Sequence, residues 1–320
     1  MLAGWVGNMN MSAKHIIPGL DDPTCGIAVA AKQLIARCIG EDGEIWVHSM
    51  WSPMVIRASF SALLTGKRLV RMPHGCTDPT KLKFHWHKKR WVAPIERWLF
   101  RRADRIIATC EEEINWIKMF EPKVKKIELI ELSRRNRGNG SRLISKEEPT
   151  CSICSTRLKL LYVGRLHPLK GVTYLLDAIA QFPNQQSIEM RLIGKDEGEG
   201  KSLKKQASRQ NLNATFEGIV SEEAKNAAYN WCDVFVLPTL SENFGLVVAE
   251  ALERGKRVIT TDGAPAWGEN LSRVERVERV EYGEILSGYD GRLIYLKGFR
   301  DGTPEERVRL LVKAIDELAT

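Results

Sequence analysis

Long apolar runs are missing from this chain of 320 residues. A membrane-spanning helix needs roughly 20 predominantly apolar residues in a row, and no run approaches that length. The residues before Lys14 also lack the basic start and long apolar centre of a signal peptide. We therefore expect a cytoplasmic protein, peripheral at most on the inner face of a membrane.

Cysteines are few and irregularly placed. Their number is seven, which is odd, and their spacing is scattered, so we expect a reducing compartment and no disulfide framework. Cys151 and Cys154 stand two residues apart, but no second cysteine pair or paired histidines follow at zinc spacing. We interpret the two thiols as part of an interdomain loop and expect no metal site.

The composition of the chain is that of a folded protein with a cationic excess. Hydrophobic residues make up 43% and charged residues 28%, which suits a sizeable core. The formal net charge of +8 suits nucleic acid, an anionic membrane surface or a phosphorylated ligand. Composition leaves all three partners open, so the choice between them depends on motifs.

Strands and helices alternate in both halves of the sequence. In the second half, short apolar runs predict strands at 158–164, 188–194, 214–220, 233–238 and 257–261. Helical patterns separate them at 172–182, 201–209, from 221 onward and at 244–254. The first half is shorter and similar in kind, with strands expected at 15–18, 45–48, 68–72 and 105–109 and helices at 27–38, 94–102 and 111–120. This alternation predicts a parallel, doubly wound sheet for the second half and, for the whole chain, two α/β domains in tandem.

A segment rich in Arg, Asn, Gly and Ser, 133–156, indicates an interdomain linker. We accordingly expect a first Rossmann-like domain at 1–150, which is shortened, and a second at 151–303. A helix at 304–320, opened by Thr303 and Pro304, ends the chain, and one option is that it packs back on the first domain. Ligands of such sheets bind at the carboxyl ends of the strands, here in a cleft between domains.

The segment from Ser241 to Gly245 joins a strand to a helix. Amide groups of Asn243, Phe244 and Gly245 at the start of a helix form an anion site. Glu242 can face sugar hydroxyls, and Glu250 in the apolar helix needs a donor such as a ribose diol. The alternative is that Glu250 is a solvent-facing residue of an ordinary amphipathic helix.

A second turn carries two cations, Arg165 and Lys170, after the strand that ends at Gly164. The two residues are spaced five apart and can bind one diphosphate together. The Arg would bind through its planar, bidentate guanidinium and the Lys through its single ammonium charge. They could equally be surface cations on a loop. The glycine turn at Gly26 is a poor phosphate loop, because fingerprint motifs contain several glycines.

His74 precedes Gly75 at the end of a strand, where a side chain is exposed to a cleft. It could position a hydroxyl or shuttle a proton, although a lone histidine is more often structural.

Cations alternate with aromatic residues between Lys81 and Arg105. This combination suits an anionic lipid interface or single-stranded nucleic acid, or else a solvated helix with a Trp-rich core face. The residues expected to form a membrane or acceptor surface are Lys88, Lys89, Arg90, Trp91 and Trp98.

In this order, the motifs resemble glycosyltransferase family 4, the retaining, nucleotide-sugar-dependent enzymes of the GT-B fold. The resemblance covers most of the chain. It rests on the seven-residue gap between Glu242 and Glu250 and on four further segments: Gly164-Arg165-Leu166 with Lys170-Gly171, Trp51-Ser52-Pro53, Pro73-His74-Gly75 with Asp78-Pro79, and 102–109.

The resemblance implies how a donor is held. Arg165 and Lys170 would neutralise the donor diphosphate, and Gly26 would let the first loop approach the donor or the acceptor. Glu250 would bind the ribose. The amides of residues 243–245 would support the phosphates and the sugar.

The resemblance also implies the reaction centre and the partners. Glu242 would hold the transferred hexose, with His74 beside it. The donor would be a nucleotide sugar, UDP- or GDP-linked, and the acceptor a glycan or a lipid-linked precursor of a cell-surface polysaccharide. Nucleic acid would not be a partner.

We expect a metal-independent reaction without a cofactor, because the sequence contains no Asp-x-Asp motif. No carboxylate is evidently placed as a covalent nucleophile, so we expect front-face attack with the donor phosphate taking the acceptor's proton. The alternatives are a nucleotide-sugar epimerase of the same fold and a non-enzymatic basic protein that binds nucleic acid. Little sequence separates residues 38 and 45, so a strand and a helix of the family's first domain should be missing.

Overall fold

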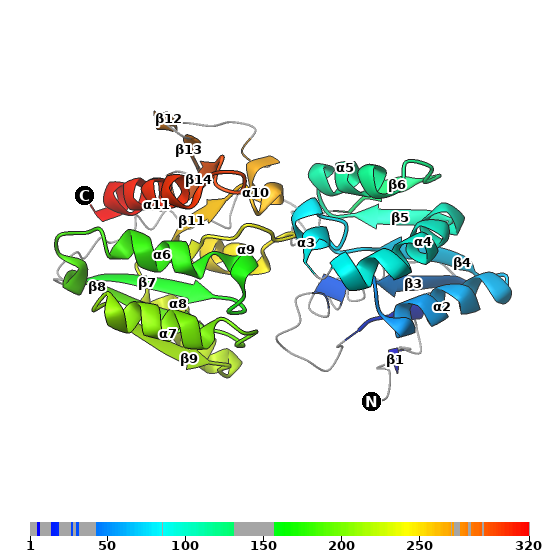
Figure 1. Ribbon diagram of the computed structural model, residues 1–320, viewed down its shortest axis with the longest axis horizontal. Coiled ribbons are helices and arrows are strands. Elements are labelled where there is room, and N and C mark those ends of the chain that lie inside the picture. Colours follow the sequence, from blue (N-terminus) through cyan, green and yellow to red (C-terminus); the bar gives the residue numbers. More distant parts are fainter. Residues whose placement is uncertain are drawn as a thin grey trace, which may run out of the picture. The chain divides into compact units, whose positions relative to one another are not determined.

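The computed structural model divides the chain into two compact units, Met1–Arg134 and Arg135–Thr320. It describes residues 5–6, 14–18, 27, 30–31, 43–84, 86–130, 157–269, 271, 276–280, 283–289 and 291–319. Gly26, Cys151, Cys154 and the linker expected at 133–156 lie outside these residues. Each unit is described by itself (Figure 1).

The second unit is built on a sheet that, among the described residues, has eight strands in the order β12-β13-β14-β11-β10-β7-β8-β9. Its strands are β7 (Leu158–Val163), β8 (Ile188–Ile193), β9 (Asn213–Gly218), β10 (Val234–Leu237), β11 (Arg257–Thr261), β12 (Arg276–Val280), β13 (Gly283–Gly288) and β14 (Leu293–Lys297). All neighbours are parallel except β12–β13 and β13–β14. The strand order therefore reverses between β7 and β10.

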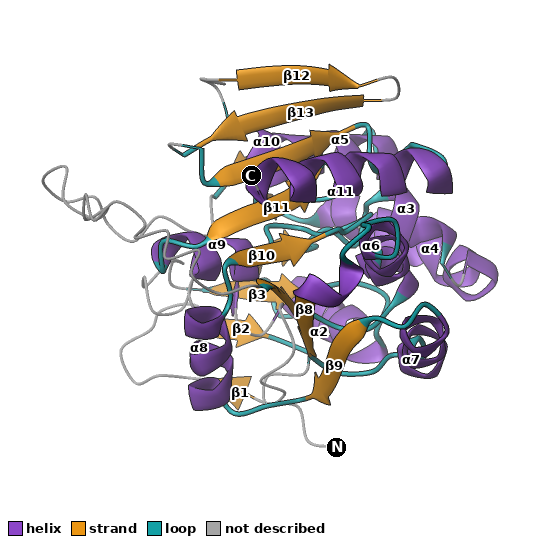
Figure 2. Cartoon of the chain, turned by 90° about the vertical axis from the view of Figure 1, so that its left-hand side faces the viewer, coloured by secondary structure: helices purple, strands orange, loops and turns teal. Residues whose placement is uncertain are grey.

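Helices cover both faces of this sheet (Figure 2). One face carries α6 (Val172–Ile179), α7 (Gly200–Arg209) and α11 (Pro304–Ala319), and the other carries α8 (Glu222–Trp231) and α9 (Leu246–Glu253). Short turns of helix complete the unit: η1 (Pro168–Lys170), η2 (Gln185–Ser187) and α10 (Pro265–Glu269). The doubly wound arrangement expected for the second half is present here.

The first unit contains a sheet whose described strands follow the order of the chain, β1-β2-β3-β4-β5-β6. They are β1 (Trp5–Val6), β2 (Lys14–Ile16), β3 (Glu44–His48), β4 (Arg68–Met72), β5 (Arg105–Ala108) and β6 (Ile127–Leu129). Only the β1–β2 pairing is antiparallel in this part of the structure. Its helices include α2 (Pro53–Leu64), α3 (Pro79–Lys83), α4 (Trp86–Arg102) and α5 (Glu111–Phe120), and residues 27, 30 and 31, where a helix was expected, are helical too.

A sequential parallel order places the connecting helices on one face of the sheet, because crossover connections are right-handed. The core of the unit agrees, since it joins one face of β3, through Ile45 and Val47, to residues of three helices: Val55, Phe100 and Ile117. The expected α/β unit with a parallel sheet is thus present here, with its described strands in chain order.

Several element boundaries differ from expectation. The helix expected to begin at Pro94 begins eight residues earlier at Trp86, with Pro94 inside it, because the preceding Lys, Arg and Trp residues are compatible with helix. The helix expected from Phe244 begins at Leu246, since Gly245 has φ +70° and acts as its N-cap. The sequence reading also missed α2, α10, β6 and the strands β12–β14.

The last helix, α11, packs on α6, β13 and β14 of the second unit. The guanidinium of Arg257 donates a 2.9 Å hydrogen bond to the Leu318 carbonyl, which ties the end of this helix to β11. Its return to the first unit stays a prediction. In the described parts of the chain, no helix combines the length and the apolar character that a bilayer crossing demands.

Candidate active site

The switch in strand order between β7 and β10 places two loops side by side. In doubly wound sheets the ligand site lies outside the carboxyl ends of the strands at this point. The loop after β7 contains Arg165 and Lys170, and the loop after β10 contains Glu242. Backbone bonds link the loops, since Leu240 N donates to the Leu169 carbonyl at 2.8 Å.

The close approach of the two loops depends on a glycine. Gly171 has φ +64°, and a Cβ added there would overlap the carbonyl oxygen of Pro238. His167 supports the same turn, because its ring accepts a 3.1 Å hydrogen bond from Leu169 N at the start of η1. The sequence therefore needs Gly171 where the first loop meets the end of β10.

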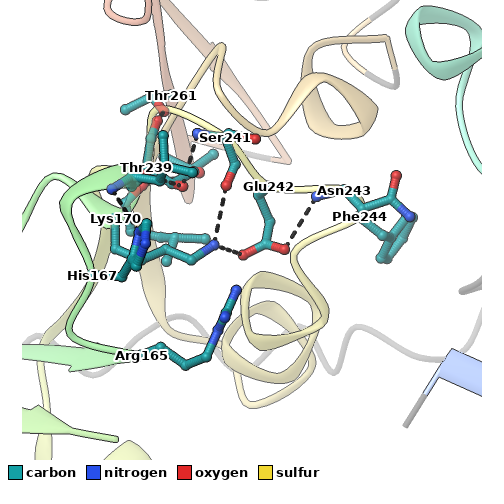
Figure 3. Close-up of polar contacts among 12 residues, drawn as sticks. Arg165, His167, Lys170, Thr239, Ser241, Glu242, Asn243, Phe244 and Thr261 are labelled. Carbon is teal, nitrogen blue, oxygen red and sulfur yellow. Dashed lines mark hydrogen bonds and ion pairs between the residues drawn. The ribbon is translucent and has the colours of Figure 1, made fainter. Parts of the chain in front are cut away.

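Lys170 is the buried cation of the site. Its side chain is 5% exposed, and its ammonium group lies 2.5 Å from Glu242 Oε2 and donates a 3.1 Å hydrogen bond to the Ser241 carbonyl (Figure 3). A charge this buried is stable only when paired and hydrogen-bonded. The structure thus brings two predicted residues of different loops, Lys170 and Glu242, into direct contact.

Glu242 is held on both carboxylate oxygens. Besides Lys170, the amide of Asn243 donates to Glu242 Oε1 at 3.1 Å (Figure 3). The Glu242 amide donates to the Gly263 carbonyl at 2.6 Å. Its side chain is still 26% exposed. A carboxylate that is oriented yet reachable from solvent can accept hydrogen bonds from hydroxyl groups of a ligand.

The helix start beyond Glu242 differs in detail from expectation. Asn243 and Phe244 are buried, and the Phe244 carbonyl accepts a 2.6 Å hydrogen bond from the indole N–H of Trp267. Because α9 begins at Leu246, its first-turn amides lie beyond Gly245 rather than at Asn243, and one of them, Val248 N, donates to the Gly245 carbonyl at 2.9 Å. The expected helix N-terminus is therefore present, two residues further along the chain.

Arg165 and Glu250 lie at the edge of this cluster and have other partners. The Arg165 guanidinium, about half exposed, pairs with Glu197 Oε2 at 2.7 Å, and Figure 3 shows it pointing to the same side as Lys170. Glu250 Oε2 lies 3.1 Å from both the Lys225 ammonium and the Tyr229 hydroxyl. Burial, reinforced by Glu250, raises the pKa of Tyr229, so this hydroxyl remains a donor.

His74 in the first unit occupies a constrained turn after β4. Both His74 (φ +53°) and Gly75 (φ +70°) have left-handed backbones, a conformation that costs a non-glycine residue free energy and often marks a functional site. The turn is held by Glu113 of α5, which accepts bonds from the Gly75 amide at 2.5 Å and the Thr109 amide at 2.7 Å. The pKa of the Glu113 carboxyl is raised above its ordinary value, because the effect of burial exceeds the opposite effect of these hydrogen bonds.

The imidazole of His74 is neutral in this environment. Burial, helped by the charge of Lys81, lowers the pKa of His74 to about 3. Its ring contacts His48, the last residue of β3, with 2.8 Å between His74 Nε2 and His48 Nδ1. The sequence reading missed His48 and Glu113. His48 could have been found from its place, because the ends of neighbouring parallel strands meet at one edge of the sheet.

The α4 residues predicted for a surface divide into two groups. Lys88, Arg90, Trp91 and Trp98 are exposed, and Trp91 is 72% exposed, with the Arg90 guanidinium 5.0 Å from the centre of its ring. Lys89 instead turns toward the unit and donates a 2.6 Å hydrogen bond to the Lys81 carbonyl. Its ammonium group also lies 5.8 Å from the centre of the Trp51 ring.

Two family models match the chain, one for each unit. The model described as Glycosyltransferase Family 4 matches residues 10–131, and the model described as Glycosyl transferases group 1 matches residues 150–270. Together they include His74, Lys170 and Glu242.

Curated relatives match parts of the chain. The phosphatidyl-myo-inositol mannosyltransferase of Mycobacterium tuberculosis is 33% identical over 109 residues, which is 32% of this chain and 28% of that protein. An uncharacterised 41.2 kDa protein in the cps region of Klebsiella pneumoniae is 26% identical over 223 residues, 69% of this chain and 60% of that protein. The chain thus aligns with less than a third of the length of the mannosyltransferase.

Solved structures share the fold. WaaG, a glycosyltransferase involved in lipopolysaccharide biosynthesis, is 14% identical with a TM-score of 0.61, covering 93% of this chain and 88% of that one. HepE from Anabaena, in complex with UDP and glucose, is 19% identical with a TM-score of 0.58, covering 93% and 76%. At these identities the likeness concerns the arrangement of strands and helices.

Proposed function

The chain belongs to the glycosyltransferases of the family 4 type, with the GT-B fold, and from this premise we propose that it transfers a hexose-type sugar from a nucleotide diphosphate sugar to a hydroxyl group. The observation that carries the proposal is the Lys170–Glu242 pair at the strand-order switch of the second unit. A cation for phosphate and a carboxylate for hydroxyls are there held together, as a nucleotide sugar requires.

The phosphate half of the donor would lie against Lys170, Arg165 and the first turn of α9. Negative charge grows on the diphosphate as the bond to the sugar breaks, and cations and helix N-termini stabilise such charge where it develops. Arg165 would exchange its solvent-accessible partner Glu197 for phosphate oxygens, which its planar fork suits. Burial already fixes the Lys170 side chain, so ordering this side chain when the donor binds costs little further free energy.

The sugar and ribose would take the two carboxylates. Glu242 has a partly exposed carboxylate for hexose hydroxyls. His74 of the first unit is the second residue that we propose for the reaction centre. Glu250 would accept from the ribose hydroxyls while Lys225 and Tyr229 hold it in place.

We propose retention at the anomeric carbon by front-face attack, with the donor phosphate taking the acceptor's proton. The assignment needs no metal, since Lys170, Arg165 and the α9 amides provide the positive charge that the leaving diphosphate needs. The HepE complex with UDP and glucose supports a UDP-sugar as the donor to test before others.

Substitutions at the pair test this proposal. Lys170→Ala and Glu242→Ala should each lower kcat for sugar transfer by about 100-fold or more, the cost of removing one group that stabilises the transition state. Lys256→Ala is the matched control, because this lysine of the same unit binds only backbone carbonyl oxygens in its described contacts, those of Asn230 and Cys232. Near-normal turnover in either site variant would refute the assignment.

The class of donor can be determined from the stability that bound ligands add to the protein. A ligand at 100 times its Kd stabilises the folded state by about 2.7 kcal/mol. Thermal shifts with UDP, GDP, ADP and their sugars should rank the nucleotides, and Lys170→Ala should abolish the shift of the preferred one. Equal shifts with all nucleotides and none with their sugars would contradict a sugar donor site.

We further propose that the acceptor is lipid-linked and that α4 lies on an anionic membrane from the cytoplasmic side. Exposed cations and indole rings on one helix suit a lipid headgroup region. Similarity to a phosphatidyl-myo-inositol mannosyltransferase and to WaaG, an enzyme of lipopolysaccharide biosynthesis, supports a lipid acceptor. The surface consists of Lys88, Arg90, Trp91 and Trp98.

Vesicle flotation tests the membrane proposal. Changing Lys88 and Arg90 to Glu should reduce binding to vesicles that contain anionic lipid, by about 1 kcal/mol for each cation lost. Lys201→Glu with Lys205→Glu on α7 makes the same charge change on an exposed helix of the second unit and should bind as the unaltered protein does. Equal binding by all three proteins would remove the role of α4.

A further inference from the structure

Three histidines from three neighbouring strand ends form a continuous chain in the first unit. His15 lies on β2, His48 ends β3, and His74 follows β4. The distance from His15 Nδ1 to His48 Nε2 is 3.0 Å, and that from His48 Nδ1 to His74 Nε2 is 2.8 Å. All three side chains are buried, at 5% exposure or less.

The rings are held in this order by the sheet. β2–β3 and β3–β4 are parallel pairs in which His15 is registered with Trp46, and His48 with Met72. The Trp46 ring stacks on that of His15, with 5.2 Å between centroids. The turn bound by Glu113 orients His74 from the other side. Neither end of the chain of rings can rotate without breaking these contacts.

Burial keeps His48 and His74 neutral. It lowers the pKa of His48 well below the ordinary value, with the neighbouring His74 and His15 adding to the effect. The pKa of His74 is about 3, again mainly through burial. At neutral pH each of these two rings therefore carries one N–H group.

When all three rings are neutral, the two N–H···N hydrogen bonds between them allow only two arrangements of the protons. If Nδ1–H of His48 donates to His74, then Nδ1–H of His15 must donate to His48, and His74 carries its own proton on Nδ1. If His74 donates through Nε2–H, then His48 donates to His15, and Nδ1 of His74 is an acceptor. The second nitrogen of each ring thus sets the tautomer of the next.

We propose that His15 and His48 are positioning residues that fix, through this coupling, whether Nδ1 of His74 donates or accepts a hydrogen bond toward a substrate hydroxyl. The first arrangement presents a donor to a sugar hydroxyl and the second an acceptor. A third group that fixes a histidine tautomer is an established catalytic device in other enzymes. The catalytic consequence rests on the proposed function, whereas the coupling itself does not.

Nitrogen-15 NMR of the histidine rings tests the coupling without any substrate. The unaltered protein should show one of the two arrangements across all three rings, with scalar couplings across both N–H···N bonds. Any other combination of tautomers, or a doubly protonated His48 at neutral pH, would overturn the proposal. His87 and His167, which lie outside the chain of rings, are internal controls.

A matched pair of substitutions sharpens the test. His15→Leu fills similar space but offers no hydrogen bond, so the signals of His48 and His74 should move toward values averaged between tautomers. His15→Gln offers both a donor and an acceptor and should keep a single arrangement. Unchanged His74 signals in His15→Leu would overturn the proposal, and the result for the unaltered protein decides it if that variant does not fold.

Kinetics then connect the coupling to transfer. His15→Leu should lower kcat by about ten-fold, which is less than the roughly 100-fold or more that a catalytic proton donor or acceptor contributes, because His74 itself is still present. KM for the donor should change little, and His15→Gln should retain most activity. Equal kcat for both variants and the unaltered protein would refute the catalytic consequence. Absence of sugar transfer by the unaltered protein would instead refute the proposed function, and the NMR result on the chain of rings would still hold.

Discussion

The two units are built from the same kind of parallel sheet, yet the carboxyl ends of their strands are stabilised differently. In the second unit, strand order reverses between β7 and β10, and helices cover both faces. In the first, described strands follow chain order, and the core helices lie on one face. The second unit thus positions its site by the close approach of two loops, with Gly171 against Pro238.

The first unit positions its residues through buried polar side chains instead. Glu113 holds the His74 turn, and Arg71 of β4 pairs with Glu96 of α4 at 2.7 Å, both side chains being fully buried. Glu96 also accepts a 2.8 Å hydrogen bond from Trp51 N. The comparison teaches that the first unit should be sensitive to the loss of a charge and the second to added volume in the backbone turn.

The largest expected effect is the loss of the buried pair. Arg71→Met leaves Glu96 as a buried charge without its cation, which should lower the free energy of unfolding of the first unit by about 3–5 kcal/mol. Hydrogen exchange resolved by peptide should detect the loss in α4 and β4, and the second unit should be unaffected.

Two controls belong with this substitution. Adding Glu96→Leu to Arg71→Met should restore most of the stability, because no buried charge is then left. Arg165→Met, which breaks the more exposed pair with Glu197, should cost about 1 kcal/mol or less. Equal losses for Arg71→Met and Arg165→Met would contradict the claim that burial distinguishes the two pairs.

The next prediction tests whether the second unit is sensitive to added volume in a backbone turn. Gly66 in the first unit and Gly171 in the second have nearly equal φ values, +65° and +64°, but a Cβ on Gly66 meets no atom within 4 Å. Gly66→Ala should therefore cost only the left-handed backbone, about 1–2 kcal/mol. Gly171→Ala should cost about 1–3 kcal/mol more, because the Cβ overlaps the Pro238 carbonyl and overpacking forces the loops apart.

Unfolding in urea measures both substitutions, and nucleotide binding separates them further. Gly171→Ala should weaken donor binding together with stability, since it moves Lys170 relative to Glu242. Gly66→Ala should leave donor binding unchanged. Equal destabilisation by the two substitutions would show that the loop contact does not limit the second unit.

The sequence predicted the second unit better than the first for a physical reason. Its buried strands are short apolar runs bounded by glycine or proline, such as those ending at Gly164 and Pro238, and period and punctuation suffice to find them. Lys170 and Glu242 could be paired because loops at a strand-order switch must meet. The strands β12 and β13 were missed, since their residues mix charged, polar and apolar side chains without a clear alternation. β14 was missed although Leu293–Leu296 is a short apolar run.

The first unit was harder to predict because its key contacts join residues far apart in sequence. Nothing near Glu113 indicates that its carboxylate reaches Gly75, a separation of 38 residues. The bond between His15 and His48 spans 33 residues and follows only from strand order. The start of α4 was misplaced because Pro94 is a common first residue of a helix, whereas here it lies in the interior.

The smallest expected effect concerns helix N-caps, which have the same local structure in both units and should therefore contribute equally to stability. Ser52 caps α2 by accepting from Val55 N, and Ser221 caps α8 by accepting from Ala224 N, both at 3.2 Å. Each Ser→Ala change should cost about 1 kcal/mol, because a side-chain acceptor is lost from the first turn. Ser→Asp at either site should be nearly neutral, since a carboxylate replaces the acceptor and suits the helix dipole. Hydrogen exchange at the first turn of each helix measures the effect, and a clearly larger loss for Ser52→Ala would mean that the first unit is fragile as a whole rather than at its buried polar contacts.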